Sequence, residues 1–178
     1  TGWARTEKVP DVYDFDWLDE VVDNLLARGI QPWFNVGYGN PIYMPDAPNS
    51  TAVGCVPTLY GEEVTAAWCR YVEAMCRHFG DRVTHFEIWN EPDLSHFWHP
   101  EKPSGEKFGQ LYLLTAKIIR GVLPNAKLGF CTCESKGEYL KPIFEQLTPS
   151  DIDFLCIHNY DRKLEFGSRY VGSFSGYD

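Results

Sequence analysis

Hydrophobic residues along the chain follow two patterns that alternate. In the first pattern, apolar side chains recur every three or four residues, the spacing that places them on one face of an α-helix. The predicted helices run from Asp14 or Asp16 to Gly29 and over about 62–79, 106–121 and 139–147. The core face predicted for the first helix comprises Leu18, Val21, Val22, Leu25 and Leu26.

Short apolar runs form the second pattern and lie between the predicted helices. They span residues 30–36, 86–89, 127–133 and 153–158. Strands buried on both faces have this composition, and strands that alternate with helices form β-α-β units with a parallel sheet. The pattern predicts an α/β fold. It does not distinguish an open, doubly wound sheet from a closed barrel. The connection 37–61 is too long for a structural turn, so we expect it over the binding face.

The second apolar run, Phe86 to Trp89, leads directly into Asn90, Glu91 and Pro92. Pro92 has no N–H for a sheet ladder, so the strand must end there. The same proline disfavours a right-handed helical conformation for Glu91, which fixes how this carboxylate leaves the strand. An acid held at the carboxyl end of a strand, beside an amide, has the geometry of a catalytic group; a solvated strand-end glutamate is the simpler alternative.

The sequence Phe-Glu-Ile-Trp-Asn-Glu-Pro-Asp at 86–93 resembles the fourth-strand motif of retaining glycoside hydrolases of clan A, which are (β/α)8 barrels. Trp98 and the order of the flanking segments make the chain most similar to glycoside hydrolase family 39, the β-xylosidase and exopolysaccharide-hydrolase group. The resemblance covers about residues 10–160 and implies the barrel. It also implies that Glu91 is the catalytic general acid/base and that Asn90 binds the sugar 2-hydroxyl.

The length of the chain bears on this mechanism. It has 178 residues, whereas a closed barrel typically needs about 250. By resemblance its strands correspond to the third to sixth of eight, so we expect residues 1–178 to form a single partial catalytic TIM-barrel domain. A retaining enzyme needs two carboxyl groups about 5 to 5.5 Å apart, and the family's nucleophile, a Glu ending the seventh strand, has no counterpart here. Asp161 and Glu134 are weak alternatives, because both have the pattern of solvated loop acids.

Other candidate substrate-binding residues follow the predicted strands, where barrel active sites form. His158 and Tyr160 follow the last strand, and Asn40 lies in a Tyr-Gly-Asn segment that resembles some family relatives. The aromatic residues Tyr38, Trp89 and Trp98 are candidates for stacking on a sugar ring, since sugar C–H faces pack on aromatic rings. Each has a structural alternative, because a strand-end aromatic or histidine is often part of the core.

Composition excludes several partner classes. A formal net charge of −9 argues against nucleic acid and anionic membrane surfaces, and no apolar run is long enough for a transmembrane helix. We expect no cofactor: the sequence lacks a phosphate loop and a G-x-G-x-x-G motif. We also expect no metal, because His96 and His99 form only a weak metal motif. The six cysteines show no C-x-x-C spacing, so buried free thiols are the simplest interpretation.

We therefore expect a domain that hydrolyses O-glycosidic bonds of a β-linked oligo- or polysaccharide with retention, with its nucleophile outside this chain. The alternative is a non-catalytic, carbohydrate-binding half-barrel that keeps the sugar contacts. A partial barrel exposes the edges of its outer strands, so we also expect a homo-oligomer, or the chain after Asp161, to cover them.

Overall fold

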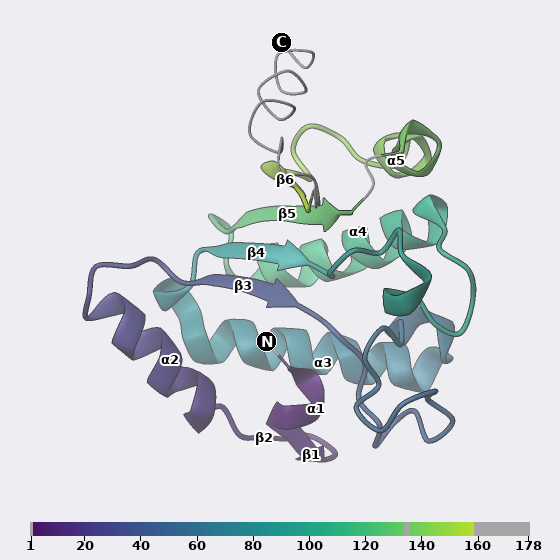
Figure 1. Ribbon diagram of the computed structural model, residues 1–178. Helices are drawn as coiled ribbons and strands as arrows, with labels where there is room; N and C mark the ends of the chain where they lie inside the picture. The colour runs from purple at the N-terminus through teal and green to yellow at the C-terminus, as the bar shows by residue number, and fades with distance from the viewer. Residues whose placement is uncertain (1, 134–135, 159–178) are drawn as a thin grey trace, which may run out of the picture.

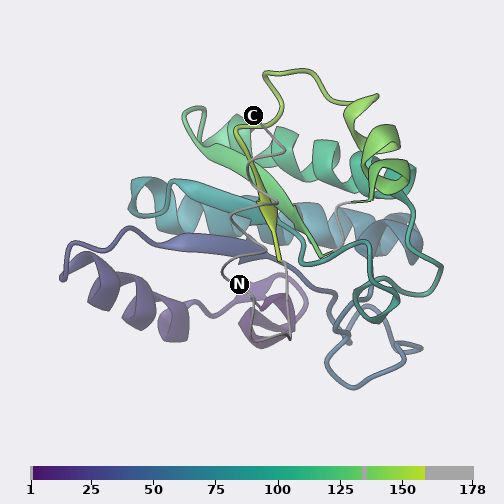
Figure 2. The same ribbon diagram turned by 45° about the horizontal axis from the view of Figure 1, so that its top comes forward.

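Parallel strands in the order β3-β4-β5-β6 form the central sheet of the computed structural model, which describes residues 2–133 and 136–158 (Figure 1). The strands are β3 (Trp33–Val36), β4 (His85–Ile88), β5 (Lys127–Thr132) and β6 (Phe154–Ile157). Each strand lies beside the strand that precedes it in the chain, which is the order of a (β/α)8 barrel. The strand direction turns steadily from β3 to β6, as Figure 2 shows.

All four predicted helices are present and connect or precede these strands. They are α2 (Asp16–Leu26), α3 (Glu62–Phe79), α4 (Gly105–Val122) and α5 (Gly137–Phe144), with short 3-10 turns at Pro57–Leu59, Gly80–Arg82 and Ser95–Phe97. The seven apolar residues of α3 at helical spacing are all buried, namely Val64, Ala67, Trp68, Tyr71, Val72, Met75 and Phe79. The described strands and helices thus form part of an α/β barrel.

The two faces of the sheet have different surroundings. Register aligns Phe34 of β3, Phe86 of β4 and Leu128 of β5, so these side chains leave the sheet on one face. That face packs on the helices, where the Phe34 ring centroid lies 5.0 Å from that of Phe79 on α3. On the opposite face, which lines the barrel interior, register aligns Asn35, Glu87 and Gly129. The prediction that both faces of each strand are buried therefore holds for β4 and β5. On β3 the interior face is exposed to solvent at Trp33, which is 50% exposed.

Gly129 makes room for an aromatic side chain in this interior. A Cβ at this position would lie 2.2 Å from a ring carbon of Phe154 on β6. The Phe154 ring in turn contacts Trp33 across the sheet, with ring centroids 4.6 Å apart. The absence of a side chain at 129 therefore lets interior aromatic residues meet below the strand ends.

Three details of the N-terminal half differ from the prediction. Val21 was expected in the core but is 48% exposed, because the buried stripe of α2 is carried by Leu18 and Val22. The first strand begins at Trp33 and not at Ile30, since Pro32 offers no donor to the ladder. At the start of α2 the N-cap position is Phe15, although the Asp14 carboxylate accepts a hydrogen bond from the Asp16 N–H at 3.1 Å.

The N-terminal segment forms elements that the apolar pattern did not predict. They are α1 (Trp3–Thr6) and the hairpin of β1 (Glu7–Val9) with β2 (Val12–Tyr13). Glu7 is fully buried, and its carboxylate accepts hydrogen bonds from the Trp3 indole, the Tyr43 hydroxyl and the Asp11 N–H. Burial, followed by the nearby Glu7 carboxylate, raises the pKa of Tyr43 to about 12. Glu7 thus ties the long 37–61 connection to the start of the chain.

The six cysteines are all free, as expected; Cys55, Cys76 and Cys131 are buried. Among the described residues, none of the helices combines the length and apolar character needed to cross a membrane.

Candidate active site

Glu91 lies directly after β4, in a backbone conformation that few residues adopt. Its φ is 48°, and Trp89 two residues earlier has a φ of 67°. Left-handed values cost a non-glycine residue about 1–3 kcal/mol and persist where the surroundings enforce them, most often at functional sites. The strand therefore ends in two strained residues that direct the Glu91 side chain.

Neighbouring strands enforce this conformation through hydrogen bonds. The Trp89 N–H donates to the Val36 carbonyl at 2.9 Å, and the Trp89 carbonyl accepts from the Asn35 amide at 3.0 Å. The Glu91 N–H donates to the Cys131 sulfur at 3.3 Å. The turn between Trp89 and Glu91 is thus held from β3 on one side and from β5 on the other.

The Glu91 carboxylate points to the end of β6. It is only 6% exposed, and its Oε1 lies 2.9 Å from Nδ1 of His158. His158 is held in turn by its own N–H, which donates to the Thr132 carbonyl at 2.9 Å. A buried carboxyl group beside an imidazole at the strand ends is suited to proton transfer. The structure therefore brings together the predicted acid/base and a predicted substrate-binding residue from strands 67 residues apart.

Tyr38 and Asn90 are also brought together. Burial raises the pKa of the Tyr38 hydroxyl above its usual range, while a hydrogen bond with the Asn90 side chain acts in the opposite direction. The Tyr38 ring stacks on Phe97, with centroids 5.7 Å apart, and meets the edge of Trp89 at 5.3 Å. Tyr38 is only partly buried, so its free surface and the Asn90 amide remain candidates for a sugar hydroxyl or ring face.

Trp89 and Trp98 do not fit the prediction of sugar stacking. Both side chains are fully buried, and their ring centroids lie 6.4 Å apart. The Trp89 indole donates to the Phe97 carbonyl at 2.8 Å, so it supports the loop after β4. A stacking platform needs an exposed ring face, which neither residue has here; the structural alternative describes both better.

Asn40 is likewise structural. It is 1% exposed, its amide donates to the Glu7 carbonyl at 2.8 Å, and its Oδ1 accepts from the Ile42 N–H at 3.1 Å. Its amide N–H and carbonyl are therefore engaged by backbone groups, and the structural alternative describes Asn40 better than the predicted substrate contact. Of the remaining candidates, Tyr160, Glu134 and Asp161 lie outside the described residues.

Below Glu91, the barrel interior holds a group that the sequence did not identify. Glu87, Cys131 and His158 have potential metal-ligand atoms that all lie within 4.8 Å of one another. The Glu87 carboxylate accepts from the Asn35 amide at 2.7 Å. Burial raises the pKa of the Cys131 thiol above its usual range and that of Cys156 to about 12. Only the alternation of positions along three strands signals this group, because no short motif joins its members.

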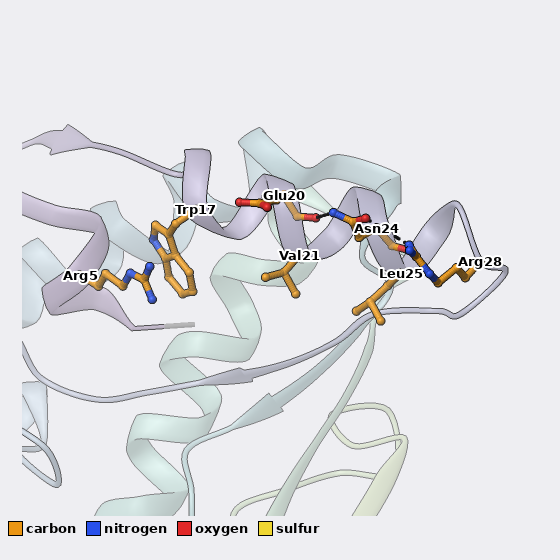
Figure 3. A pocket seen from close by; sticks show the side chains of 7 residues that line it. All are labelled: Arg5, Trp17, Glu20, Val21, Asn24, Leu25 and Arg28. Carbon is orange, nitrogen blue, oxygen red and sulfur yellow. Dashed lines mark hydrogen bonds between the residues drawn. The ribbon is translucent and has the colours of Figure 1, made fainter.

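Two hollows in the surface differ in what they are suited to bind. One, of about 520 Å³, is lined by Tyr38, Asn35 and residues of the N-terminal segment and the 37–61 connection. The other, of about 590 Å³, lies on α2, where Val21 and Leu25 project beside Arg5 and Trp17 (Figure 3). Glu91, Asn90 and His158 line neither hollow, but the first is lined by Tyr38 and Asn35, which contact the turn after β4, and the second is not. The hollow beside Tyr38 is therefore the better candidate for substrate.

Comparison with known proteins places this geometry in a family. The model of glycosyl hydrolases family 39 matches residues 3–173. A beta-xylosidase of Geobacillus stearothermophilus is 27% identical over 169 residues, which cover 85% of this chain and 31% of that enzyme. A beta-xylosidase of Caldicellulosiruptor saccharolyticus is 24% identical over 168 residues, covering 88% of this chain and 33% of that enzyme. The chain thus spans about a third of the length of these relatives.

Solved structures show the same fold. A family 39 glycoside hydrolase from the gut symbiont Bacteroides cellulosilyticus WH2 aligns with a TM-score of 0.66 and 21% identity, covering 88% of this chain and 31% of that one. Xylanase XynB from Paenibacillus barcinonensis aligns with a TM-score of 0.59 and 14% identity, covering 89% of this chain and 50% of that one. The predicted partial (β/α)8 barrel is therefore confirmed, and the chain belongs to glycosyl hydrolase family 39.

Proposed function

We propose that the protein containing this chain hydrolyses β-linked glycosidic bonds with retention of configuration, and that Glu91 is its general acid/base. The observation that carries the proposal is the placement of Glu91: buried, held by two strained backbone positions at the end of β4, and 2.9 Å from His158. Two relatives named as beta-xylosidases support a β-linked sugar as the substrate class.

In this mechanism the protonated Glu91 donates its proton to the leaving-group oxygen while a second carboxylate attacks the anomeric carbon. The resulting glycosyl-enzyme bond is then broken by water, which gives a proton to Glu91 as it attacks. The retaining mechanism of the family requires that second carboxylate within about 5 to 5.5 Å of the first. We assign it to the part of the relatives' length that this chain does not span, so residues 1–178 form one portion of a single catalytic domain.

His158 is proposed as a positioning residue and Asn90 as a sugar ligand. The hydrogen bond between His158 Nδ1 and Glu91 Oε1 fixes which oxygen of Glu91 is free to face the substrate. Asn90 precedes Glu91 in the chain, and its amide lies beside the Tyr38 hydroxyl. The Asn90 amide and the Tyr38 hydroxyl therefore lie next to Glu91, where a pyranose hydroxyl needs a hydrogen-bond partner. No cofactor takes part in the reaction.

The test uses the complete protein and aryl glycosides with good and poor leaving groups. A good leaving group departs without a proton, so Glu91→Gln should lose about 10²–10⁴-fold in rate on the poor leaving group and far less on the good one in the first, glycosylation step. Azide should restore turnover of Glu91→Ala and give a glycosyl azide of retained configuration, because azide needs no general base. Glu145→Gln, at an exposed carboxylate on the far end of α5, is the control.

Equal losses on both leaving groups, or a Glu91→Gln variant as active as the parent, would rule out the acid/base role. A complete protein that binds β-linked oligosaccharides but releases no product would instead support the carbohydrate-binding alternative.

A further inference from the structure

The barrel-interior cluster below Glu91 has the composition of a metal site. Glu87 comes from β4, Cys131 from β5 and His158 follows β6, and their potential ligand atoms all lie within 4.8 Å of one another. Glu87 is 8% exposed and Cys131 is fully buried. The group is therefore no exposed acidic patch; it is a buried set of a carboxylate, a thiol and an imidazole.

A second thiol lies beside this set. Cys156 of β6 is the register partner of Cys131 on β5, so both side chains leave the sheet on the interior face. Beside burial, the Glu87 carboxylate also raises the pKa of each thiol, and the Cys131 thiol donates to the Trp89 carbonyl at 3.6 Å. The clustered atoms supply three of the four ligands that a tetrahedral ion requires, and the Cys156 thiol on the neighbouring strand is the candidate for the fourth.

The ligand types select the metal. Thiolate and imidazole ligands favour Zn²⁺, whereas Mg²⁺ and Ca²⁺ take oxygen ligands. A buried carboxylate also needs compensation for its charge. Within residues 2–133 and 136–158, the carboxylate of Glu87 forms no ion pair with a lysine or arginine; it accepts a hydrogen bond from the Asn35 amide at 2.7 Å. A divalent cation that replaces the thiol protons would supply that compensation.

We propose that Glu87, Cys131, Cys156 and His158 bind Zn²⁺, and that the bound ion inhibits the enzyme. Each thiol that binds the metal releases one proton to solvent, with no change in oxidation state. The ion engages His158, the hydrogen-bond partner of Glu91, and so alters the placement of the acid. This site goes beyond the proposed hydrolysis, which uses no metal, and it differs from the His96–His99 pair considered from the sequence.

Binding is tested on the complete protein, purified with a chelator and kept reduced. Co²⁺ serves as the spectroscopic probe, because thiolate-to-cobalt charge transfer and the bands of a tetrahedral ion report directly on the ligands. We expect one Co²⁺ bound per chain with both signatures, and its displacement by Zn²⁺. Cys131→Ser and Cys156→Ser should each weaken binding at least about tenfold, whereas Cys69→Ser on α3 should leave it unchanged. Cys69, like Cys156, is a partly buried free thiol.

Activity gives an independent measurement. Zn²⁺ should lower the hydrolysis rate at least about tenfold in the parent protein and in Cys69→Ser, with full recovery when a chelator is added. Cys156→Ser should keep its basal rate and lose the sensitivity. Two results would overturn the proposal: a cobalt complex without charge transfer, or metal binding that is equally tight in both cluster variants. A cobalt spectrum as expected in a protein without glycosidase activity would support the metal site and contradict only the proposed function.

Discussion

Nδ1 of His158 lies 2.9 Å from Oε1 of Glu91, and this contact joins the ends of β6 and β4 across the intervening strand β5. The imidazole is partly exposed, while the carboxylate side chain is buried. The contact therefore connects the buried acid to the open end of the barrel. It is the main geometric reason for assigning the chemistry to this end of the sheet.

The first prediction concerns this contact. His158→Ala should lower kcat/KM about 10- to 100-fold, because it leaves the buried Glu91 oxygen without its partner, which costs about 1–3 kcal/mol. The loss should be larger for poor leaving groups, since they depend on the proton that Glu91 donates. Steady-state kinetics on a leaving-group series measures the effect. His96→Ala, at an exposed histidine, is the matched control, and a loss of the same size on every leaving group would contradict the positioning role.

A second prediction separates Asn40 from the site. Asn40→Ala should destabilise the protein by about 1–3 kcal/mol, because the variant leaves the buried Glu7 carbonyl and the Ile42 N–H without partners. KM for a glycoside should stay near the parent value. Urea unfolding measures the stability and steady-state kinetics measures KM, with Asn125→Ala at an exposed asparagine as control. A large rise in KM with unchanged stability would restore Asn40 to the substrate-binding residues.

The third prediction is a pH dependence at the opposite end of the sheet. Asp153 accepts hydrogen bonds from the Leu128 N–H at 2.9 Å and from Arg120 and Lys127 at 2.9 and 3.0 Å. Burial tends to raise the pKa of Asp153, but the Leu128 N–H and the two cations outweigh it and hold the pKa below the ordinary 3.8. Since the folded-state pKa is the lower one, this stabilisation is complete above 3.8 and is lost as the pH falls through the folded-state value.

Asp153→Asn should therefore reduce the free energy of unfolding by about 1–3 kcal/mol at neutral pH. The difference from the parent should shrink as the pH falls below about 4, where the parent carboxylate also becomes protonated. Thermal unfolding over a range of pH measures this. Asp46→Asn, at an exposed loop aspartate, should show no such trend; a difference that stays constant down to low pH would mean that the Asp153 charge contributes nothing.

A fourth prediction concerns the edges of the sheet. Among the described residues, β3 and β6 each pair with one neighbouring strand, and Trp33, Leu155 and Ile157 are between 38% and 50% exposed. Such edges promote association, so residues 1–178 produced alone should form dimers or larger species. Sedimentation velocity at several concentrations tests this prediction. Leu155→Lys should reduce the association while Val12→Lys, on the β1–β2 hairpin, should not; a monomer at every concentration would contradict the expectation.

The sequence was sufficient for the elements of the barrel and for the choice of a candidate acid. Helical spacing identified α2 to α5, and the apolar runs identified β3 to β6, because local periodicity reflects which face of an element is buried. The motif ending in Pro92 identified Glu91 as the candidate acid. These inferences depend on residues close together in the chain, so they can be made from the sequence without a structure.

Tertiary structure decided which residues share the site and which only support it. Nothing local distinguishes Asn40 from Asn90, yet the first is enclosed by Glu7 and Ile42 while the second lies beside Tyr38. Trp89 and Trp98 are buried only because the loop after β4 folds back over them. Glu87, Cys131 and His158 are 44 and 27 residues apart in the sequence. Each lies two residues beyond the register partner of the one before, since Glu87 pairs with Gly129 and Cys131 with Cys156, and they meet because the strands of a barrel are tilted and staggered. The sequence by itself determined the strands β3 to β6, the helices α2 to α5 and the candidate acid. The packing of β3 to β6 determined the surroundings of that residue, because burial and hydrogen-bond partners depend on residues from distant parts of the chain.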